Sequence, residues 1–585
     1  MKSIYLQFDF LNQKPCSFAS PIEVLSTTDS NEIPALMEKM NEFKKEGYYL
    51  AGYLSYEAAP AFQTNYQVND KPLIPLLWFG VFDKPRPVKP IQPAAYTTSE
   101  WKPLIKKESF IQNIETIQEY IKNKKTEQVN YTTRFEASFE GDAYTFYNQL
   151  KKNQSASYSA YLQLGELQIL SLSPELFFKI DGKRIITKPM KGTMKRGFSY
   201  KEDEELKSLL YSSEKNRYEN EMVAKLLKDE LSTLVKANTA TIEKKFEIET
   251  HPTIHQMTST VSGELKEESS IYDWFRALFP CGSITGSPKV ETMQIIKSLE
   301  DSPRDVYCGA IGYITPDNRA IFNVPIRTVQ IKGNQAIYGS GSGVTSKSEP
   351  IQEYYEVIEK TKILTKEQIE FSLLESMRYE NGEINHLSDH LARLKESASY
   401  FQFTYDQDNV MSEIRRFIAT LQDNPPSKIR LLMSDNGKIN LEAIPLEKLN
   451  SIRSKLSPQP IKKENLFLYH KTTNRSVYEQ FDSKLPNGYQ TTLLWNEEGH
   501  VTEFSIGNLV IEKNGHYYTP PLSDGLLPGV MRGKLLANNT LIEKHIKKEQ
   551  LLEADQIFLI NSVRGWIKVD LKEQEVSLNK THLLQ

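Results

Sequence analysis

Short apolar runs and helical repeats alternate through the first 365 residues of the chain. Runs typical of strands occur at residues 167–173 (LQILSLS), 176–180 (LFFKI) and 184–189 (RIITKP). Residues 219–236 instead predict a helix, because apolar side chains recur there at helical spacing, namely Met222, Leu226, Leu227, Leu231 and Leu234. This mixture predicts a large α+β unit.

The pattern changes near residue 366. The helix-like residues 353–370 give way to the strand-like residues 371–384, which turn at Asn381-Gly382. We therefore predict one domain at residues 1–365 and a second at residues 366–585. The second should be smaller and strand-rich, because strand-like runs recur at residues 429–434, 466–473, 491–496, 508–520 and 555–561.

Composition agrees with two soluble domains. The chain has 585 residues, which exceeds the roughly 250–300 residues of a single core. Lys plus Arg (72) nearly balances Asp plus Glu (75), so no basic field predicts nucleic acid or an anionic membrane as a partner. No run approaches the roughly 20 apolar residues of a membrane span. Because the N-terminus also lacks a signal-peptide core and the chain has 3 cysteines, we expect a cytoplasmic protein.

A lysine in the first domain occupies a position that suits covalent chemistry. Lys191 lies in PMKGTMKRG, between a proline-restricted position and Gly192, directly after a strand-like run. A lysine fixed in this way could act as a nucleophile. A solvated basic surface formed by Lys188, Lys191, Lys195 and Arg196 explains the same residues.

A lysine in the second domain also occupies a position that could suit covalent chemistry. Lys471 follows the alternating residues Leu466, Leu468 and His470, so we expect it at the end of a strand, projecting into a cleft. A lysine there could hold a carbonyl cofactor covalently. A lysine after a strand is commonplace, however, and His470 is expected to be structural.

Three further features suit a ligand that carries carboxylates. Residues 278–300 form a Gly/Ser/Thr loop that leads into a predicted helix, where backbone N–H groups suit an anion. Residues 338–344 (YGSGSGV) allow close approach of a ligand to the backbone, and Arg327 offers a forked donor for a carboxylate. Each has a structural alternative, since glycines often only make turns and Arg327 could be paired within the fold.

Carboxylates also gather on one predicted helix. Glu349, Glu353, Glu356 and Lys360 follow one another at spacings of four, three and four residues, which places them on one face. Adjacent carboxylates need a cation, and Mg²⁺ prefers oxygen ligands. A solvated face with a Glu356–Lys360 ion pair explains the pattern equally.

Taken together, these segments resemble the chorismate-utilising enzyme family over most of residues 48–362. The marks of the family stand here as AGYLSYEAAP (51–60), EQVNYTTR (127–134), LSPELFF (172–178), PMKGTMKRG (189–197), HPTIHQMTSTVSGEL (251–265), LFPCGSITGSPK (278–289), GAIGYITP (309–316), FNVPIRT (322–328) and the GSGSG stretch. The combination is specific, and it favours the functional alternative for the features above.

The resemblance implies a reaction and a set of site residues. Lys at the position of Lys191 is typical of the members that form 4-amino-4-deoxychorismate, whereas anthranilate synthases usually have Ala there. Lys191 is then implied to attack the chorismate ring, and Glu175 to protonate the departing hydroxyl before ammonia displaces Lys191. Implied Mg²⁺ ligands are Glu219, Glu353 and Glu356, and implied substrate-binding residues are Thr285, Arg327, Gly341, Ser342, Gly343 and Lys360.

Three positions depart from the family pattern. Asn216 stands where an acidic residue is usual, and Lys225 begins a run that usually carries further carboxylate and Arg side chains. Gln256 stands where the family has a His, with His255 adjacent. These departures leave open a catalytically impaired scaffold or regulatory subunit as an alternative.

The second domain resembles class IV, fold-type-IV pyridoxal-phosphate enzymes over about residues 371–570. The resemblance rests on FSLLESMRYENG (371–382), HLARLKESASYF (390–401), HKTTNR (470–475), VTEFSIGNLVI (501–511), TPPLSDGLLPGVMR (519–532) and IFLINSVRG (557–565). It implies a fold of two α+β subdomains. It also implies pyridoxal 5'-phosphate bound covalently by Lys471, with Glu503 at the pyridine nitrogen. Implied phosphate-holding positions are Arg393, Val530, Met531 and Ser562.

Both halves imply the same intermediate. We therefore expect an α+β protein, a chorismate-binding α/β sandwich followed by a fold-type-IV domain, that makes 4-aminobenzoate, with lyase chemistry in the second half. No cysteine lies in a Gly-x-Cys-x-Gly setting, so ammonia should come from a separate glutamine amidotransferase subunit or from solution. Fold-type-IV relatives usually dimerise, which implies a possible homodimer through the second domain. An anthranilate- or isochorismate-forming half fused to a transaminase is the enzymatic alternative.

Overall fold

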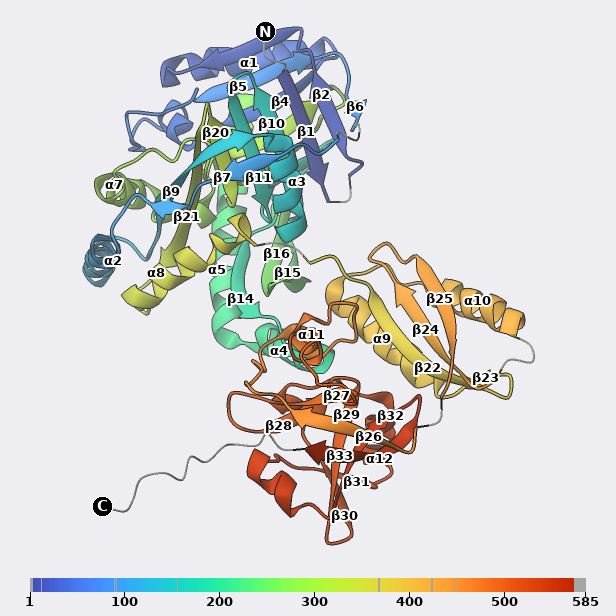
Figure 1. Cartoon of the computed structure of the whole chain (residues 1–585). Helices are drawn as coiled ribbons and strands as arrows, with labels where there is room; N and C mark the ends of the chain where they lie inside the picture. Colours follow the sequence, from blue (N-terminus) through green and yellow to red (C-terminus); the bar gives the residue numbers. More distant parts are fainter. Residues whose placement is uncertain are drawn as a thin grey trace, which may run out of the picture. The chain divides into compact units, whose positions relative to one another are not determined.

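The chain divides into two compact units (Figure 1). The computed structural model describes residues 4–11, 13–88, 90, 92–154, 156–366, 369–421, 425–447 and 449–572. One unit comprises Met1–Lys195 and Lys207–Gln368, and the other Arg196–Leu206 and Ile369–Gln585. The boundary expected after residue 365 stays a prediction at this precision, since residues 367 and 368 lie outside the described part.

Two large sheets form the framework of the first unit. In the described residues, the first sheet has the strand order β17 (Gly286–Ser287), β9 (Gln128–Gly141), β21 (Gln335–Val344), β20 (Thr328–Lys332), β11 (Leu167–Ser173), β10 (Tyr158–Leu164), β1 (Ile4–Phe10), β2 (Cys16–Ala19) and β6 (Arg86–Pro87), with β7 (Tyr96–Thr98) and β8 (Lys102–Pro103) paired to β9. The second has the order β14 (Met190–Lys195), β16 (Ile254–Glu264), β13 (Arg184–Thr187), β12 (Leu176–Asp181), β19 (Arg319–Asn323), β18 (Ala310–Thr315), β4 (Tyr49–Leu54), β5 (Leu77–Phe82) and β3 (Glu23–Thr27), with β15 (Thr241–Thr250) paired to β16.

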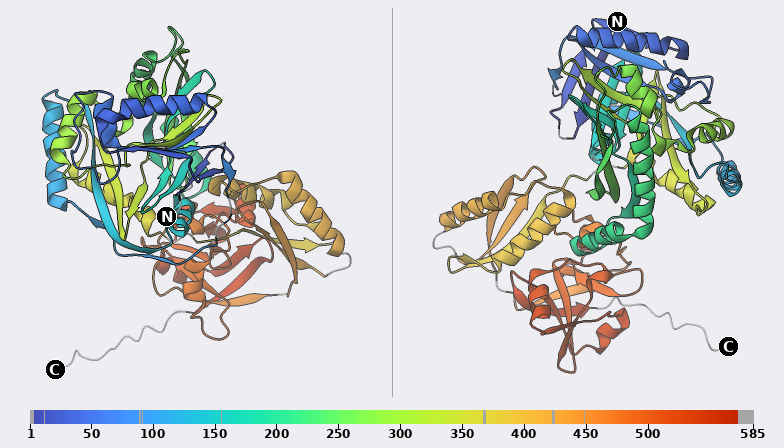
Figure 2. Two further views of the ribbon diagram at one scale, coloured as in Figure 1. Left: turned by 90° about the horizontal axis from the view of Figure 1, so that it is seen from above. Right: turned by 180° about the vertical axis from the view of Figure 1, so that it is seen from behind.

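Each sheet packs against the other and against its own layer of helices. Buried Leu6 and Phe8 of the first sheet and Tyr53 and Ile311 of the second belong to one core cluster, so the inner faces of the sheets meet. Outer helices cover the first sheet, namely α2 (Lys107–Lys122), α3 (Ala143–Gln154), α7 (Lys289–Leu299) and α8 (Pro350–Glu359). The second sheet is covered by α1 (Ile33–Lys45), α5 (Glu214–Ser232) and α6 (Ile271–Leu278), and Figure 2 shows the long α5 beside β15 and β16. The predicted α/β sandwich is confirmed.

The second unit contains two α+β subdomains, as predicted. In the smaller, α9 (Leu387–Phe401) and α10 (Gln407–Ile418) pack on a sheet of order β23 (Glu383–Ile384), β22 (Leu373–Glu380), β24 (Ser427–Met433) and β25 (Ile439–Pro445). The larger has the order β28 (Val501–Phe504), β27 (Thr491–Trp495), β26 (Ser451–Leu456), β33 (Gly565–Lys572), β32 (Gln556–Asn561), β29 (Gly507–Lys513), β30 (His516–Thr519) and β31 (Leu541–Glu543), with α11 (Ser476–Asp482) and α12 (Val530–Ala537). Because β28 also pairs with β29, six of these strands close into a ring.

Most predicted elements are present, and one is wrong. The strands expected at residues 167–173 and 176–180 and the Asn381-Gly382 turn are confirmed, and positive φ angles of 54° and 85° fit a tight hairpin between β22 and β23. Residues 466–473, expected as a strand, instead begin with a 3₁₀ turn at Leu466–Leu468. The Asn465 side chain caps this turn by accepting a hydrogen bond from the Phe467 N–H.

A short segment of the N-terminal half of the sequence belongs to the second unit. The chain leaves the first unit after Lys195. The guanidinium of Arg196 then lies over the Tyr400 ring and donates a hydrogen bond to the carbonyl of Tyr400 (2.9 Å). The Nε2 atom of His470 lies 3.1 Å from the carbonyl oxygen of Phe198. Burial lowers the pKa of His470 to about 4, so the ring is neutral and structural, and its Nε2–H donates to that carbonyl. The sequence pattern contains no sign of this insertion.

Two further observations concern membrane-spanning helices and cysteines. None of the described helices combines the length and the apolar character that crossing a membrane requires. Cys16, Cys281 and Cys308 are all free thiols.

Candidate active sites

Lys191 lies on β14, whose backbone is held on both sides of the lysine. Asn220 on α5 donates its amide to the carbonyl of Lys191 (3.2 Å). Gln256 on β16 donates to the carbonyl of Gly192 (3.0 Å) and accepts a hydrogen bond from the Thr193 hydroxyl (3.1 Å). The departure at Gln256 therefore has a structural role, because an amide supplies the donor and the acceptor that this strand uses.

Glu175 lies between β11 and β12 and is buried. The hydroxyl of Ser283 donates to Glu175 Oε1 (2.6 Å) from the Gly/Ser/Thr loop, whose 3₁₀ turn spans Gly282–Ile284. Burial raises the pKa of Glu175 to about 7, against the opposing effects of Ser283 and Lys191. A carboxyl group with this pKa keeps a proton near neutral pH and can deliver it to a leaving group.

The amine of Lys191 is surrounded by the residues expected at the first site. Burial lowers the pKa of Lys191, and Glu175 exerts the largest opposing electrostatic effect, followed by Glu219. Gly343 on β21 is also adjacent, since a Cβ built there would lie 3.7 Å from Lys191 Nζ. A half-buried lysine with a lowered pKa suits nucleophilic attack, and here a buried acid accompanies it.

Arg327 and Lys360, two cations expected to bind the substrate, have different partners in the structure. Arg327 has a left-handed φ of 52°, burial lowers its pKa, and no acidic side chain of the described residues forms an ion pair with it. A half-buried, unpaired guanidinium in a strained backbone fits a carboxylate-binding role. Lys360 donates to the carbonyl of Gly341 (2.8 Å) and pairs with Glu356 (2.7 Å), so it supports the glycine-rich β21.

The remaining substrate candidates differ in how they are engaged. The hydroxyl of Ser342 is buried without a hydrogen-bond partner, as expected of a group that awaits a ligand. Thr285 instead turns its hydroxyl to the carbonyl of Cys281 (3.1 Å), which holds the Gly/Ser/Thr loop.

The three expected magnesium ligands come from two helices. Glu219 lies on α5, and Glu353 and Glu356 lie on α8. Their oxygens match the ligands that Mg²⁺ prefers, and Glu219 and Glu356 both act electrostatically on Lys191. Within the described ranges, however, these carboxylates do not form a group of three with ligand atoms within 4.8 Å of one another. The donor chemistry therefore fits Mg²⁺, without an assembled coordination shell.

The other two departures lie on α5. The Asn216 side chain donates to the Ser213 hydroxyl (2.9 Å) at the start of the helix and lies against Gly192, where an added Cβ would be 3.0 Å from Asn216 Cβ. Lys225 forms an exposed ion pair with Glu221 (3.9 Å). Asn216 thus contacts the strand that carries Lys191, whereas Lys225 does not contribute to it.

In the second unit, Lys471 lies in a cavity of about 350 Å³ between the two subdomains. The carbonyl of Lys471 accepts a hydrogen bond from the Leu374 N–H (2.9 Å), which ties its backbone to β22 rather than to the strand predicted around it. Burial and then the charge of Arg393 lower the pKa of Lys471 to about 8. An amine with this pKa is substantially neutral near pH 8 and suits covalent capture of a carbonyl.

Glu503 lies on β28 in the wall of the same cavity. Tyr478 donates its hydroxyl to Glu503 Oε1 (2.8 Å), and Asn508 donates its amide to Oε2 (3.1 Å). Burial raises the pKa of Glu503 to about 7, and no cation in the described part of the chain forms an ion pair with it. A buried carboxylate that lacks a positive partner fits the protonated nitrogen of a pyridine ring, so the residues present fit pyridoxal phosphate.

The phosphate candidates line this cavity from several elements. Val530 and Met531 begin α12, and Ser562 lies in the turn before β33. Arg393 is less free than expected, because it makes two hydrogen bonds to buried Glu375 (2.9 and 2.6 Å) and one to the carbonyl of Pro528 (3.1 Å). It therefore also positions the loop that leads into α12.

A cluster of cations in the cavity was missed by sequence reasoning. Lys428 and Arg430 project from β24, and Arg564 lies beside Ser562. Burial, with Arg564 and Arg430 next, lowers the pKa of Lys428, and the Nε of Arg564 is buried without a hydrogen-bond partner. Every second residue of β24 is buried, and this alternation was the one feature from which the cluster of cations could have been found. The cluster suits a ligand with more than one carboxylate.

Each half of the chain matches a family of known proteins. Residues 86–366 match the chorismate binding enzyme family, and residues 372–571 match amino-transferase class IV. The chain is 34% identical over 270 residues to aminodeoxychorismate synthase component 1 of Escherichia coli (strain K12), which covers 46% of this chain and 60% of that protein. It is 32% identical over 266 residues to anthranilate synthase component 1 of Aquifex aeolicus (strain VF5), covering 46% and 54%.

A solved structure extends the comparison to the fold. Anthranilate synthase component I from Streptococcus pneumoniae TIGR4 aligns with a TM-score of 0.52 at 22% identity, over 63% of this chain and 91% of that chain. This likeness concerns the fold alone. The chain spans less than two thirds of the length of the curated relatives named above. Because the two family matches cover residues 86–366 and 372–571, the chain carries a chorismate-binding enzyme domain followed by a class IV amino-transferase domain.

Proposed function

We propose that the chain makes 4-aminobenzoate from chorismate in two steps, one in each unit. The first unit would replace the ring hydroxyl of chorismate by an amino group, and the second would remove pyruvate from the product. The observation that carries the proposal is the pairing of half-buried Lys191 with buried Glu175, a candidate nucleophile and a candidate acid whose pKa values are both shifted toward neutrality.

The first step uses two successive allylic displacements. Lys191 Nζ forms a bond to the ring, the double bond shifts, and the hydroxyl departs with a proton from Glu175 as water. Ammonia then attacks the carbon that carried the hydroxyl, and Lys191 leaves with the electron pair of its bond. Arg327 and Ser342 would hold the carboxylates, and Glu219, Glu353 and Glu356 would hold Mg²⁺, which neutralises one of them. A separate glutamine amidotransferase subunit would supply the ammonia.

Intact-protein mass spectrometry tests the covalent step. In the absence of ammonium, wild-type protein with chorismate and Mg²⁺ should gain the mass of chorismate less one water, and peptide mapping should place it on Lys191. An unmodified protein, or an adduct on another residue, would contradict the proposed step.

The second step relies on Lys471 and Glu503. Pyridoxal phosphate, when bound, supplies an electron sink next to the amine that it carries. Glu503, held by Tyr478 and Asn508, would keep the ring nitrogen protonated. With its pKa near 8, Lys471 Nζ can accept and return the proton whose movement accompanies loss of pyruvate and aromatisation. A homodimer through this unit is part of the proposal.

The pH dependence of amination should follow Glu175. Its raised pKa keeps the acid protonated below about pH 7, so kcat should fall as pH rises through that value. Glu175→Gln should lower kcat by about 10²- to 10⁴-fold and abolish this alkaline limb. Stopped-time assays of chorismate amination between pH 6 and 9 measure both effects, with exposed Glu268→Gln as the control. An unchanged alkaline limb in Glu175→Gln would exclude Glu175 as the acid.

The cations of the second cavity should recognise the substrate. Arg564→Ala removes a charged donor, so KM for aminodeoxychorismate should rise by about 10- to 100-fold. Bound cofactor, measured by its absorbance, should stay at the wild-type level. Exposed Arg416→Ala on α10 is the control. Loss of cofactor from Arg564→Ala would instead assign this arginine to the phosphate.

Removal of divalent metal should separate the two steps. Chelation should abolish amination, and Mg²⁺ alone should restore it, because a dicarboxylate substrate beside three glutamates needs a cation. Pyruvate release from supplied aminodeoxychorismate should continue. Amination that persists after exhaustive chelation would contradict the assignment of Glu219, Glu353 and Glu356.

A further inference from the structure

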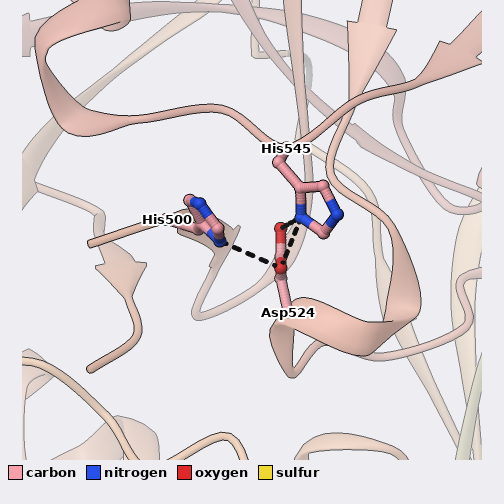
Figure 3. A group of neighbouring side chains, drawn as sticks. All are labelled: His500, Asp524 and His545. Atoms are coloured by element: carbon pink, nitrogen blue, oxygen red, sulfur yellow. Dashed lines mark hydrogen bonds and ion pairs between the residues drawn. The ribbon is translucent and has the colours of Figure 1, made fainter. Parts of the chain in front are cut away.

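One group of side chains outside both candidate active sites has the geometry of metal ligands. His500, Asp524 and His545 place three ligand atoms within 4.8 Å of one another, and they are the one such group in the described residues. Figure 3 shows both imidazole rings turned toward the Asp524 carboxylate. The Nδ1 of His545 lies 2.8 Å from Asp524 Oδ1, and the Nδ1 of His500 lies 3.3 Å from the same oxygen.

The carboxylate at the centre of this group needs a positive partner. The Asp524 side chain is only 1% exposed, and the two imidazoles are its ion-pair partners in the described chain. A buried carboxylate without a cation is costly. The Nδ1 of His500 is itself buried without a hydrogen-bond partner, although a polar atom in that position is normally satisfied. A metal ion coordinated by all three side chains removes both costs.

The backbone around the group is fixed before any ion binds. Buried Asn496 donates its side-chain amide to the carbonyl of Asp524 (3.0 Å) and accepts a hydrogen bond from the His500 N–H (3.0 Å). The segment of His545 is joined to β28, because the Val501 N–H donates to the carbonyl of Ile546 (2.7 Å). Three separate stretches of chain are thus held so that their ligands converge.

We propose that His500, Asp524 and His545 bind a transition-metal ion of the zinc class. Two imidazole nitrogens and one carboxylate form a borderline N/O ligand set, which favours Zn²⁺ or Co²⁺ over Mg²⁺ or Ca²⁺. His545 is 57% exposed, so water can complete the coordination from the solvent side. Glu498 lies at the edge of the group, with its Oε2 3.8 Å from His500 Nδ1, and is itself paired with Lys463.

The position of this site defines its role. His500 precedes β28, the strand of Glu503, and Asp524 lies in the loop that continues into Gly529 and α12. Gly529 is packed so closely on Asn508 that an added Cβ would lie 2.0 Å from its side-chain oxygen. An ion here joins the strand and the loop that form the cofactor cavity, so it acts as a structural staple rather than as a participant in the reaction.

Metal titration of the full chain tests the proposal. Protein stripped with a chelator and kept in excess Mg²⁺ is titrated with Zn²⁺ against a chromophoric competitor, and wild type should bind one more Zn²⁺ per chain than His545→Ala. The affinity at this site should fall by more than about 100-fold in the variant. Because the His545 ring is exposed, this variant should keep its fold. Exposed His516→Ala on β30 is the matched control and should bind like wild type.

Two further readouts make the test decisive without any activity assay. Co²⁺ should give the visible absorption bands of a low-coordinate N/O site in wild type, and Asp524→Asn should lose them. Zn²⁺ should raise the thermal midpoint of wild type but not of His545→Ala. Equal Zn²⁺ uptake by wild type and His545→Ala, or none by wild type, would overturn the proposal and leave His545 as a simple hydrogen-bond partner of Asp524.

Discussion

Lys191→Ala should abolish amination of chorismate while leaving pyruvate release from supplied aminodeoxychorismate unchanged. The lysine is the proposed nucleophile, and removal of a nucleophile that forms a covalent intermediate costs at least about 10³-fold in kcat. The backbone of β14 should persist, because Asn220 and Gln256 hold it through main-chain carbonyls rather than through the lysine side chain. Chorismate consumption and aminodeoxychorismate formation, followed by chromatography, measure the loss.

Lys195→Ala is the matched control for this variant. Lys195 lies on the same strand with its side chain exposed. This variant should aminate chorismate as wild type does, with kcat and KM within about two-fold, as expected of a surface substitution. If Lys191→Ala retained amination at a comparable rate, ammonia would be attacking chorismate directly and the covalent route would be wrong.

Lys471→Ala should abolish the second step and the covalent retention of cofactor. The variant lacks the amine that anchors pyridoxal phosphate and moves the substrate proton, so pyruvate release should fall at least about 10³-fold. After dialysis, the visible absorbance of the bound cofactor should be lost, which is a readout independent of turnover. Amination of chorismate should be unchanged, and aminodeoxychorismate should accumulate.

Exposed Lys462→Ala provides the control for the second variant, because it lies on the same stretch of chain without lining the cavity. It should retain cofactor and pyruvate release. Persistent cofactor absorbance after dialysis of Lys471→Ala would place the covalent attachment on a different lysine.

The sequence predicts the elements whose pattern is local. The strands at residues 167–173 and 176–180 are bounded by turns and carry runs of apolar residues, and the structure confirms both. Residues 466–473 have a similar alternation, yet Leu466–Leu468 forms a 3₁₀ turn. Over so few residues, a period of two cannot be distinguished from a single helical turn, so only the packing decides.

The site residues divide in the same way. Lys191, Glu175, Lys471 and Glu503 lie in recognisable motifs and could be named from the sequence. The groups that hold them could not, because they come from distant segments. Ser283 is 108 residues from the Glu175 to which it donates, and Asn220 is 29 residues from Lys191, whose carbonyl accepts its amide. The cluster of Lys428 and Arg564 likewise exists only once two subdomains enclose the cavity.

One chain should perform both steps, amination of chorismate and release of pyruvate. Purified protein should be incubated with chorismate, ammonium, Mg²⁺ and pyridoxal phosphate, and every aromatic product and any pyruvate identified by mass spectrometry. We expect 4-aminobenzoate and pyruvate in equal amounts. Anthranilate, isochorismate or untouched chorismate would contradict the role of Lys191, and aminodeoxychorismate without pyruvate would contradict the lyase step.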